Sequence, residues 1–369
     1  MEQARNISTH PRAFHHVALM PDCHRGFGIP IGCVVACRGA LIPNAVGVDI
    51  GCGMAALRTP LRADDLEGGA VSAIIRETAE RIPVGEGVSR RNPLPLPPEI
   101  ALPSWLDSRA RSLASANLGT LGGGNHFIEL QAGDDGFIWL TIHTGSRNLG
   151  YRIARHHNEI AVRMQSRFGK APADLAFLPD DSDEGILYVR DMETAMAYAR
   201  ANRSAVMGDF AEVFAGVTGC RITGEPISIH HNYASKETHF GAHVWVHRKG
   251  ATSAREGETG IIPGSMGTTS WIVRGLGSPD SFMSCSHGAG RVLGRREASR
   301  KLSVEECREA MRGVIYGTSG RGGRLRGFGE GADLSEAPAA YRDIDKVMRN
   351  QADLVAPLVR LRPLGVLKG

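Results

Sequence analysis

Glycine is concentrated in short motifs that each follow an apolar, strand-like run, and this pattern limits what the chain can fold into. The sequence holds 46 glycines in 369 residues, well above the roughly 7% of an average protein. Neither a collagen-like period nor a repeat of about 20–50 residues is visible, which excludes a fibrous chain, a solenoid or a propeller. We therefore expect the extra glycines in turns where the backbone passes close to another group.

The overall composition indicates a globular protein with a sizeable core. Apolar residues make up 42% of the chain and charged residues 22%, which excludes extensive disorder. The net charge of +4 excludes a histone-like cation or an acidic tail protein but allows a local basic groove. The most apolar region, residues 26–57, is interrupted by polar side chains and falls short of the ~18 uninterrupted residues of a membrane span.

The cysteines and the N-terminal residues predict a cytoplasmic location. The first residues lack the apolar segment of a signal peptide. The seven cysteines are odd in number and scattered, which is typical of free thiols in a reducing compartment. Cys33 and Cys37 lie in the apolar run IGCVVAC, where buried core thiols are expected rather than ligands.

Residue periodicity predicts short strands alternating with longer helices. Strands are expected at His16–Met20, Cys33–Ala36, Phe137–His143, Ile227–His231, Val244–His247 and Trp271–Val273. Helices are expected at Ala70–Arg81, Leu149–Phe168, Leu187–Phe214 (one helix or two), Val304–Arg312 and Ile344–Val359. Ser303 and Glu306 have the spacing of a capping box at the start of one of these helices.

Three segments are predicted to be loops, and none of them divides the chain. Asn92–Pro103 holds five prolines, and Asp180–Glu184 is almost wholly acidic. Gly317–Gly331 is rich in glycine and arginine, so it is a mobile lid, an RNA-facing loop or a plain solvated loop. We expect one mixed α/β (α+β) domain over residues 1–369, with central β-sheets, helices outside and chemistry on glycine-rich turns.

Asp49 and Cys52 form the first candidate site, in the motif VGVDIGCG. The surrounding glycines let the backbone fold sharply, so a carboxylate and a thiolate can converge on one point. A thiolate has more than one lone pair and can bridge two cations. Taken alone, the motif is equally typical of a tight turn with a buried thiol.

Three histidines strengthen the metal-site interpretation. His126, His143 and His231 each lie at or beside the end of an apolar run, next to glycine or asparagine. Residues at strand ends face the crevice of a sheet. One such histidine is usually a satisfied core residue, but three together with Asp49 and Cys52 favour a two-metal site. Imidazole and thiolate ligands favour zinc, whereas the oxygen of Asp49 also suits manganese or iron.

Two further motifs suggest phosphate chemistry. The turn PGSMGTTS begins at Pro263 and resembles an anion cradle of backbone N–H groups with the Ser265 hydroxyl, although an ordinary tight turn has the same pattern. His287 in CSHGAGR has little steric cover, so its neutral ring could attack an α-phosphate and form a phosphoramidate. Arg291 and Arg295 share one face if a helix starts there, and they could clamp phosphates. The alternative is a helix-capping histidine beside solvated arginines.

Basic residues also flank the candidate metal histidines. Arg147 follows His143, and Lys249 lies in the segment HRKG. With so small a net charge, these residues indicate a local phosphate track rather than a uniformly cationic surface.

Taken together, these motifs resemble those of the RtcB family of RNA ligases, which join RNA 3′-phosphate or 2′,3′-cyclic phosphate ends to 5′-hydroxyl ends. The matching segments occur in family order and span residues 20–369. They are MPDCHRGFGIPIG, AVGVDIGCGM, LGTLGGGNHFIE, HTGSRNLG, HHNYASKE, VHRKGATSA, GIIPGSMGTTS, CSHGAGRVLGR, EAPAAYRDIDKVM and RPLGVLKG.

The resemblance implies a role for each candidate residue. His287 matches the histidine that becomes guanylylated, Asp22 an acidic residue that orients it, and Cys52 the ligand that bridges two manganese ions. The implied metal ligands are Asp49, Cys52, His126, His143 and His231. The implied GTP contacts are Asn125, His126, Phe127, Glu129, His231, Asn232, Pro263, Gly264, Ser265, Met266, Ser270, His287, Gly288, Ala289, Gly290, Tyr341 and Lys368. The implied RNA or anion contacts are Arg147, Lys249, Arg291 and Arg295.

The implied reaction has three steps. His287 attacks the α-phosphate of GTP and pyrophosphate leaves; the guanylate passes to the RNA 3′-phosphate; the 5′-hydroxyl then attacks that phosphate and GMP leaves. Such chemistry serves tRNA splicing or RNA repair, and the compact length resembles a bacterial subgroup associated with repair. The unfamiliar Gly317–Gly331 insert, and Cys23 at a usually apolar position, leave the RNA substrate and any activating or release-factor-like partner open.

Two other interpretations remain at this point. A dinuclear metal phosphoesterase would use the same ligands but leave His287 and Lys368 without a role. An RNA-binding protein that has lost catalysis would lack a ligand or the nucleophile, whereas all of these positions are filled in this sequence.

Overall fold

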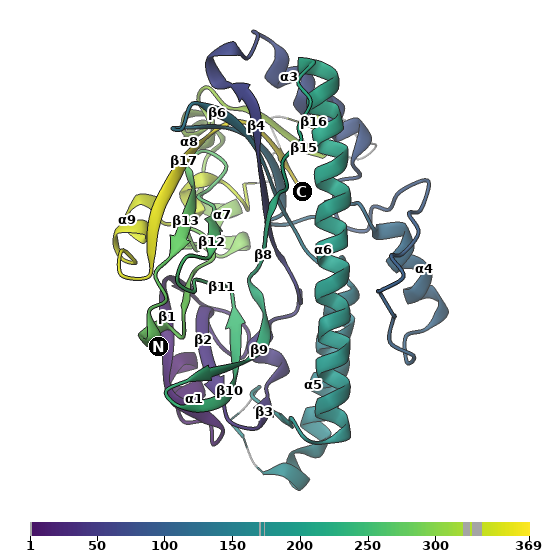
Figure 1. Ribbon diagram of the computed structural model, residues 1–369, viewed down its shortest axis with the longest axis vertical. Coiled ribbons are helices and arrows are strands. Elements are labelled where there is room, and N and C mark those ends of the chain that lie inside the picture. The colour runs from purple at the N-terminus through teal and green to yellow at the C-terminus, as the bar shows by residue number, and fades with distance from the viewer. Residues whose placement is uncertain (1, 170, 173, 320–324, 327–333) are drawn as a thin grey trace.

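The computed structural model describes residues 2–169, 171–172, 174–319, 325–326 and 334–369. Over this part of the chain the fold is mixed α/β, as predicted. A large sheet and a smaller one are flanked by helices, and one long helix runs along almost the whole molecule (Figure 1). The helices are α1 (Glu2–Ser8), α2 (Pro43–Val46), α3 (Ala70–Arg81), α4 (Ser108–Asn117), α5 (Leu149–Phe168), α6 (Asp183–Thr218), α7 (Arg295–Lys301), α8 (Val304–Ala310) and α9 (Ile344–Arg349).

The large sheet has nine strands and is antiparallel except where β15 pairs with β17. Its main path, in spatial order, is β12 (Thr259–Ile262), β13 (Ser270–Gly275), β17 (Val355–Lys368), β5 (Phe127–Gly133), β6 (Phe137–Thr144), β4 (Gly53–Arg62) and β8 (Ile227–His230). The remaining two strands are β15 (Ile315–Ser319) and β16 (Leu325–Arg326).

The antiparallel order brings the ends of four strands, β4, β5, β6 and β8, together on one side of this sheet. Gly53, at the start of β4, pairs with Thr144 at the end of β6 and with His230 at the end of β8. Phe127, at the start of β5, pairs with His143. Residues just outside these strand ends are therefore neighbours in space, although more than 170 positions separate Cys52 from His231.

The smaller sheet lies beside these strand ends, and its residues Asn232 and Lys249 line the same cavity as His143 and His231. Its spatial order is β1 (Ala13–His24), β2 (Ile31–Cys37), β10 (Ala242–Lys249) and β9 (Asn232–His239). Two short pairs complete the strands, namely β11 (Ala251–Ser253) with β14 (Ser284–Ser286) and β3 (Ala40–Leu41) with β7 (Leu178–Pro179).

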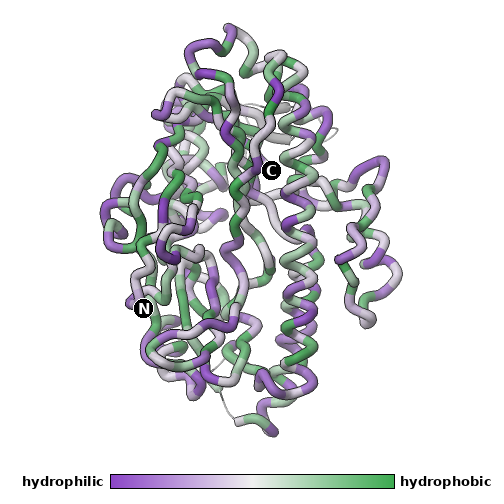
Figure 2. The backbone as a smooth tube through the Cα atoms, in the orientation of Figure 1, coloured by the Kyte–Doolittle hydropathy of each residue, from purple (hydrophilic) through white to green (hydrophobic). Residues whose placement is uncertain are grey.

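Helix α6 covers one face of the large sheet. Phe210 and Phe214 pack with Leu140 and Ile142 of β6 in one buried cluster. Hydrophobic segments follow the strands, while α6 alternates between hydrophobic and hydrophilic residues (Figure 2), as expected for a helix with one buried face. The predicted interval Leu187–Phe214 is thus a single, longer helix.

The C-terminal prediction was wrong. A helix was expected over Ile344–Val359, but α9 ends at Arg349 and β17 begins at Val355. Pro357 and Pro363 each lie beside a register shift in the pairing of β17. Proline disrupts a helix interior but is tolerated at such bulges, and the strand completes the sheet between β13 and β5.

The other loop and cysteine predictions were mostly confirmed. Residues 92–103 contain neither helix nor strand. The acidic segment is not only a loop, because Asp183 and Glu184 form the first turn of α6, where negative charge is favourable. Of Gly317–Gly331, positions 317–319 and 325–326 belong to β15 and β16, and the others lie outside the described residues.

Cys33 and Cys37 are fully buried in an apolar cluster, and all seven thiols are free. The capping box of Ser303 and Glu306 is present at the start of α8. Among the helices of the described chain, none combines the length and the apolar character that crossing a membrane requires.

Candidate active site

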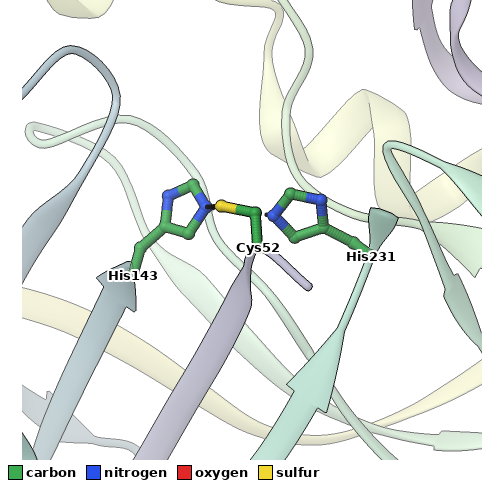
Figure 3. A group of neighbouring side chains, drawn as sticks. All are labelled: Cys52, His143 and His231. Atoms are coloured by element: carbon green, nitrogen blue, oxygen red, sulfur yellow. Dashed lines mark hydrogen bonds between the residues drawn. The ribbon is translucent and has the colours of Figure 1, made fainter. Parts of the chain in front are cut away.

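Cysteine and histidine side chains from four segments converge at these strand ends. Figure 3 shows three of them, Cys52, His143 and His231. Cys52 Sγ lies 3.4 Å from His126 Nε2 and 3.3 Å from His143 Nε2. His143 Nε2 is in turn 3.0 Å from His231 Nε2. Asp49 Oδ2 completes the cluster at 3.4 Å from His126 Nε2. The structure thus brings together all five residues that the sequence suggested as ligands.

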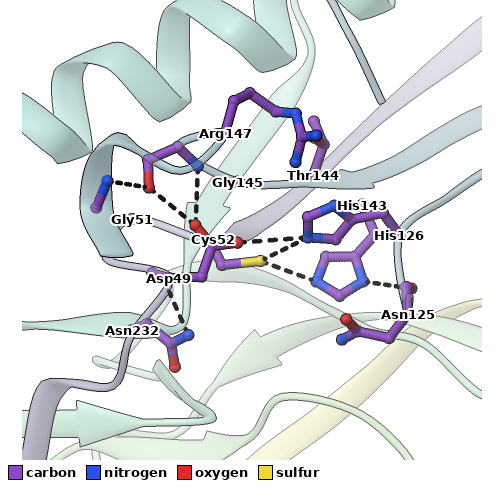
Figure 4. A network of polar contacts seen from close by, with 12 residues as sticks. Asp49, Gly51, Cys52, Asn125, His126, His143, Thr144, Gly145, Arg147 and Asn232 are labelled. Atoms are coloured by element: carbon purple, nitrogen blue, oxygen red, sulfur yellow. Dashed lines mark hydrogen bonds and ion pairs between the residues drawn. The ribbon is translucent and has the colours of Figure 1, made fainter. Parts of the chain in front are cut away.

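Backbone carbonyl groups orient two of the imidazole rings, and the contact of His143 with Asn125 is visible in Figure 4. His126 Nδ1 lies 3.0 Å from the carbonyl oxygen of Leu121, and His143 Nδ1 lies 3.1 Å from that of Asn125. A carbonyl oxygen only accepts hydrogen bonds, so each Nδ1 carries the proton and each Nε2 keeps its lone pair. Both lone pairs are then available at the centre of the cluster.

Hydrogen bonds and tight turns also fix Asp49 and Cys52. Asp49 Oδ1 accepts from the backbone N–H of Ser146 at 3.1 Å and from its hydroxyl at 2.8 Å. Gly51 adopts a left-handed backbone with φ of 78°, a conformation that glycine adopts without strain. This turn places Cys52 directly before β4, in which Met54 pairs with His143.

The protonation states of the histidines and of Asp49 in this cluster are those that bind a cation. Burial lowers the pKa of His143 and His231 well below the usual value, so both rings are neutral, the form that binds metals. Burial raises the pKa of Asp49, but its contacts with His126 and Ser146 and the charge of Arg147 outweigh this effect and lower that pKa. Burial and the charge of Asp49 raise the pKa of Cys52 well above the usual value, and a bound cation would reverse this effect.

The donor atoms fall into two groups that share Cys52. One group is Cys52, His143 and His231, and the other is Asp49, Cys52 and His126; within each, the donor atoms lie within 4.8 Å of one another. Each of these three-donor groups could hold a divalent cation, and Cys52 belongs to both groups.

A cavity of about 310 Å³ opens beside this cluster, a volume within the range of small-molecule sites. Many of the predicted residues line it, namely Asp49, Asn125, Phe127, Glu129, His143, His231, Asn232, Lys249, Pro263, Gly264, Ser265, Met266, His287, Gly288, Ala289, Gly290, Arg291, Arg295, Tyr341 and Lys368. The other predicted residues, namely Asp22, Cys52, His126, Arg147 and Ser270, are absent from its lining.

His287 lies at the cavity wall, directly after β14. Its Nδ1 is 2.6 Å from Asp22 Oδ2, and its backbone N–H donates to the same oxygen at 3.2 Å. Asp22 is fully buried on β1. The rings of His287 and His231 have centroids 5.0 Å apart, so the candidate nucleophile adjoins the candidate metal cluster.

Another part of the cavity wall is built around Glu336, a residue that the motifs above did not single out. Its Oε1 lies 3.0 Å from Arg291 Nη1 and 2.7 Å from Arg295 Nε. The hydroxyl of Tyr341 donates to its other oxygen, and Lys368 Nζ is 3.8 Å away. Glu336 opens the quoted segment EAPAAYRDIDKVM, so its place in that motif was the available signal.

The arginines do not share a helical face, contrary to expectation. Arg291 precedes α7, and Arg295 is the first residue of that helix. They meet through Glu336 rather than through helical spacing. Arg291 is largely buried, whereas the side chain of Arg295 is 53% exposed, so Arg295 is the more accessible of the two.

Two N–H groups of the predicted anion cradle already have partners. The N–H of Ser265 donates to Thr268 Oγ1 at 2.7 Å, and that of Gly264 donates to Ser270 Oγ at 3.3 Å. The expectation of unpaired N–H groups is therefore wrong at these two positions, because nearby hydroxyl groups accept from them. Ser270 supports the cavity wall rather than lining it.

Lys249 and Arg147 are more enclosed than a surface phosphate track would require. Lys249 Nζ donates to the carbonyl oxygens of Asn44, at 2.9 Å, and Phe27, and burial lowers its pKa to about 8. Arg147 Nε donates to Thr120 Oγ1 at 3.1 Å. Lys249 reaches the cavity, whereas Arg147 lies behind it.

The family model described as tRNA-splicing ligase RtcB matches residues 3–99 and 98–369. The chain belongs to the RtcB family of RNA ligases. As a member of this family it is an RNA ligase.

Relatives of the RtcB family match this chain over its whole length. The RNA-splicing ligase RtcB of Escherichia coli K12 is 40% identical, over 100% of this chain and 93% of that protein. The RNA-splicing ligase RtcB of Mycobacterium bovis is 33% identical, over the full length of both. The tRNA-splicing ligase RtcB of Pyrobaculum aerophilum is 32% identical, over 100% of this chain and 91% of that protein.

Proposed function

We propose that this protein is a GTP- and manganese-dependent RNA ligase that joins RNA 3′-phosphate or 2′,3′-cyclic phosphate ends to 5′-hydroxyl ends. The observation that carries the proposal is the placement of His287. It lies in the cavity wall, its Nδ1 faces Asp22, and its ring adjoins His231 of the metal cluster.

Asp22 positions the proposed nucleophile. A carboxylate beside Nδ1 holds the imidazole in the tautomer that keeps the Nε2 lone pair free. Nε2 then forms a bond to the α-phosphorus of GTP as the bond to pyrophosphate breaks. In the second step the guanylate passes to an oxygen of the RNA 3′-phosphate, which restores His287. In the third step the RNA 5′-hydroxyl attacks the phosphorus of the activated RNA 3′-phosphate, and GMP leaves.

The proposed metal centre consists of Asp49, Cys52, His126, His143 and His231. Two bound Mn²⁺ ions would supply charge neutralisation at the phosphates. Nitrogen and sulfur ligands alone would favour zinc, whereas the carboxylate oxygen of Asp49 is a ligand that suits manganese.

The remaining cavity residues are proposed to hold GTP and RNA. The proposed guanosine end is formed by the buried Glu129 and Lys368 and the half-buried Tyr341, which together offer both donors and acceptors. Burial raises the pKa of Glu129 to about 8, although Lys368 opposes this shift. Arg295, with its exposed guanidinium, is the proposed contact for the RNA phosphate, together with Arg147, Lys249 and Arg291.

We further propose that residues 1–369 act as one catalytic domain in the cytoplasm, where seven free thiols are stable. RNA repair or tRNA splicing would be its role, with or without an activating partner.

The deciding experiment is incubation with GTP labelled at the α-phosphate, in the presence of Mn²⁺, followed by denaturing electrophoresis. The proposal predicts a labelled protein band, whereas GTP labelled at the γ-phosphate should leave the band unlabelled. A protein that binds Mn²⁺ and hydrolyses phosphate esters but never takes up the α-label would instead be a dinuclear phosphoesterase.

A further inference from the structure

We propose that Asn202 and Arg203, adjacent residues on α6, position the loops that carry the metal ligands and thereby set the affinity for Mn²⁺. Neither is a ligand, and both are almost completely buried. This inference rests on the proposed metal centre and assigns positioning residues to it.

Arg203 connects the ends of three strands. Its Nη1 donates to the carbonyl oxygens of Gly51, at 3.0 Å, and of Thr144, at 3.4 Å. Its Nη2 lies 3.1 Å from His230 Nδ1, and its Nε donates to Ser228 Oγ at 3.2 Å. Three of these four partners directly adjoin a ligand in sequence, since Gly51 precedes Cys52, Thr144 follows His143 and His230 precedes His231. Arg203 therefore contacts the turn before β4 and the ends of β6 and β8.

Asn202 makes the same kind of connection to the remaining two ligands. Its Oδ1 accepts from the backbone N–H groups of Gly119, at 2.7 Å, and Thr120, at 3.2 Å. Its Nδ2 lies 3.1 Å from Thr144 Oγ1 and 3.2 Å from the carbonyl oxygen of Gly145. The loop after Thr120 supplies the Leu121 carbonyl that orients His126. Gly145 packs against Asp49, because a Cβ at Gly145 would lie 2.1 Å from Asp49 Oδ2.

The backbone of α6 also touches the turn between Asp49 and Cys52. A Cβ on Gly51 would lie 2.9 Å from the Cα of Met196 and 3.0 Å from the Cβ of Ala199. Ala195, Ala199 and Arg203 follow one another at intervals of four residues, so they lie on one face of the helix. The small side chains of Ala195 and Ala199 allow α6 to approach Gly51. Arg203, four residues after Ala199, donates to the carbonyl oxygen of Gly51.

The charge of Arg203 distinguishes it from an ordinary packing residue. A buried guanidinium is costly unless its N–H groups find acceptors. Its acceptors here are the carbonyl oxygens of Gly51 and Thr144 and the hydroxyl of Ser228, and no carboxylate among the described residues forms an ion pair with it. A single rigid guanidinium that spans three strand ends fixes their spacing, which a flexible ammonium on lysine cannot do equally well.

The test compares the affinity for Mn²⁺ of purified full-length variants by equilibrium dialysis. The variants are Arg203→Lys, Arg203→Met and Asn202→Asp, and the matched control is Arg200→Met, at an exposed position of the same helix. Far-UV circular dichroism checks that each variant is folded. Absorption of the Co²⁺-loaded proteins reports whether the thiolate of Cys52 still binds the metal.

We expect Arg203→Met and Asn202→Asp to weaken Mn²⁺ binding about 10- to 100-fold, the usual effect of changing a residue that supports metal ligands. Arg203→Lys should lie between Arg203→Met and the unaltered protein, and the thiolate–Co²⁺ band should shift or weaken in the same order. Arg200→Met should bind as the unaltered protein does.

Wild-type affinity and an unchanged Co²⁺ spectrum in folded Arg203→Lys and Asn202→Asp would overturn the positioning role. If Arg203→Met does not fold, those two milder variants still decide the question. Failure of the unaltered protein to bind Mn²⁺ or Co²⁺ would instead refute the metal centre of the proposed function.

Discussion

At the scale of single residues, His287 and the metal ligands occupy neighbouring but separate environments. His287 contacts Asp22 on β1, whereas the ligands are held by backbone carbonyl groups and by Ser146. Replacing His287 by alanine should therefore abolish the protein–GMP adduct and leave Mn²⁺ affinity unchanged. Labelling with α-labelled GTP and equilibrium dialysis of Mn²⁺ measure the two quantities on the same preparation. An adduct that still forms in His287→Ala would show that another residue is the nucleophile.

Cys52 is the residue that both donor groups share, so its loss should affect both proposed ions. A neutral hydroxyl is a far poorer donor than a thiolate. Cys52→Ser should lower Mn²⁺ affinity by more than the about 10- to 100-fold expected for an outer residue, and guanylylation should stop. Elemental analysis after dialysis measures the metal content. The control is Cys220→Ser, at a half-buried thiol on the C-terminal side of α6, which should keep full metal content and activity.

At the scale of elements, periodicity predicted the helices well where one face is apolar. The bounds of α3 and α5 agree with the expectation to the residue. The prediction failed at β17, because an apolar run with two prolines pairs with β13 and β5, and that pairing depends on residues at least 80 positions away in sequence. Tertiary pairing of this kind is invisible to local propensity.

The capping box of α8 offers a prediction at this same scale. Ser303 Oγ accepts from the N–H of Glu306 at 3.1 Å, and the Glu306 carboxylate accepts from the N–H of Ser303 at 3.0 Å. Ser303→Ala should lower the free energy of unfolding by about 0.5–2 kcal/mol without changing guanylylation. Urea denaturation followed by circular dichroism measures the change. Ser299→Ala, within α7 and exposed, should leave stability unchanged or slightly higher, because alanine is the better helix former.

At the scale of the whole molecule, the candidate site is assembled from segments that span nearly the entire chain, from Asp22 to Lys368. The motifs made its members recognisable, and all five proposed ligands converge as expected. Their supports could not be read from motifs. Asn202 and Arg203 act through contacts whose partners lie 25 or more positions away in sequence, and a buried arginine in a helix pattern gives no local signal of what it binds.

The distribution of charge over the molecule leads to the last prediction. The net charge is only +4, so attraction of RNA must come from local cations such as Arg295 at the mouth of the cavity. Glu336 holds this guanidinium at 2.7 Å while half of the side chain stays exposed. Arg295→Ala should therefore leave formation of the His287–GMP adduct intact but slow the transfer of GMP to the RNA 3′-phosphate.

Salt provides the independent measurement of that role. Each phosphate contact to a single strand contributes about 0.7 to the slope of log affinity against log salt, so the slope for RNA binding should fall by about this amount in Arg295→Ala. Raising the salt concentration should slow GMP transfer in the unaltered enzyme in the same way. The matched control is Arg349→Ala, at an exposed position on α9 outside the cavity, which should retain both the slope and the transfer rate. If Arg295→Ala transfers labelled GMP at the normal rate across the whole salt series, the arginine takes no part in that step.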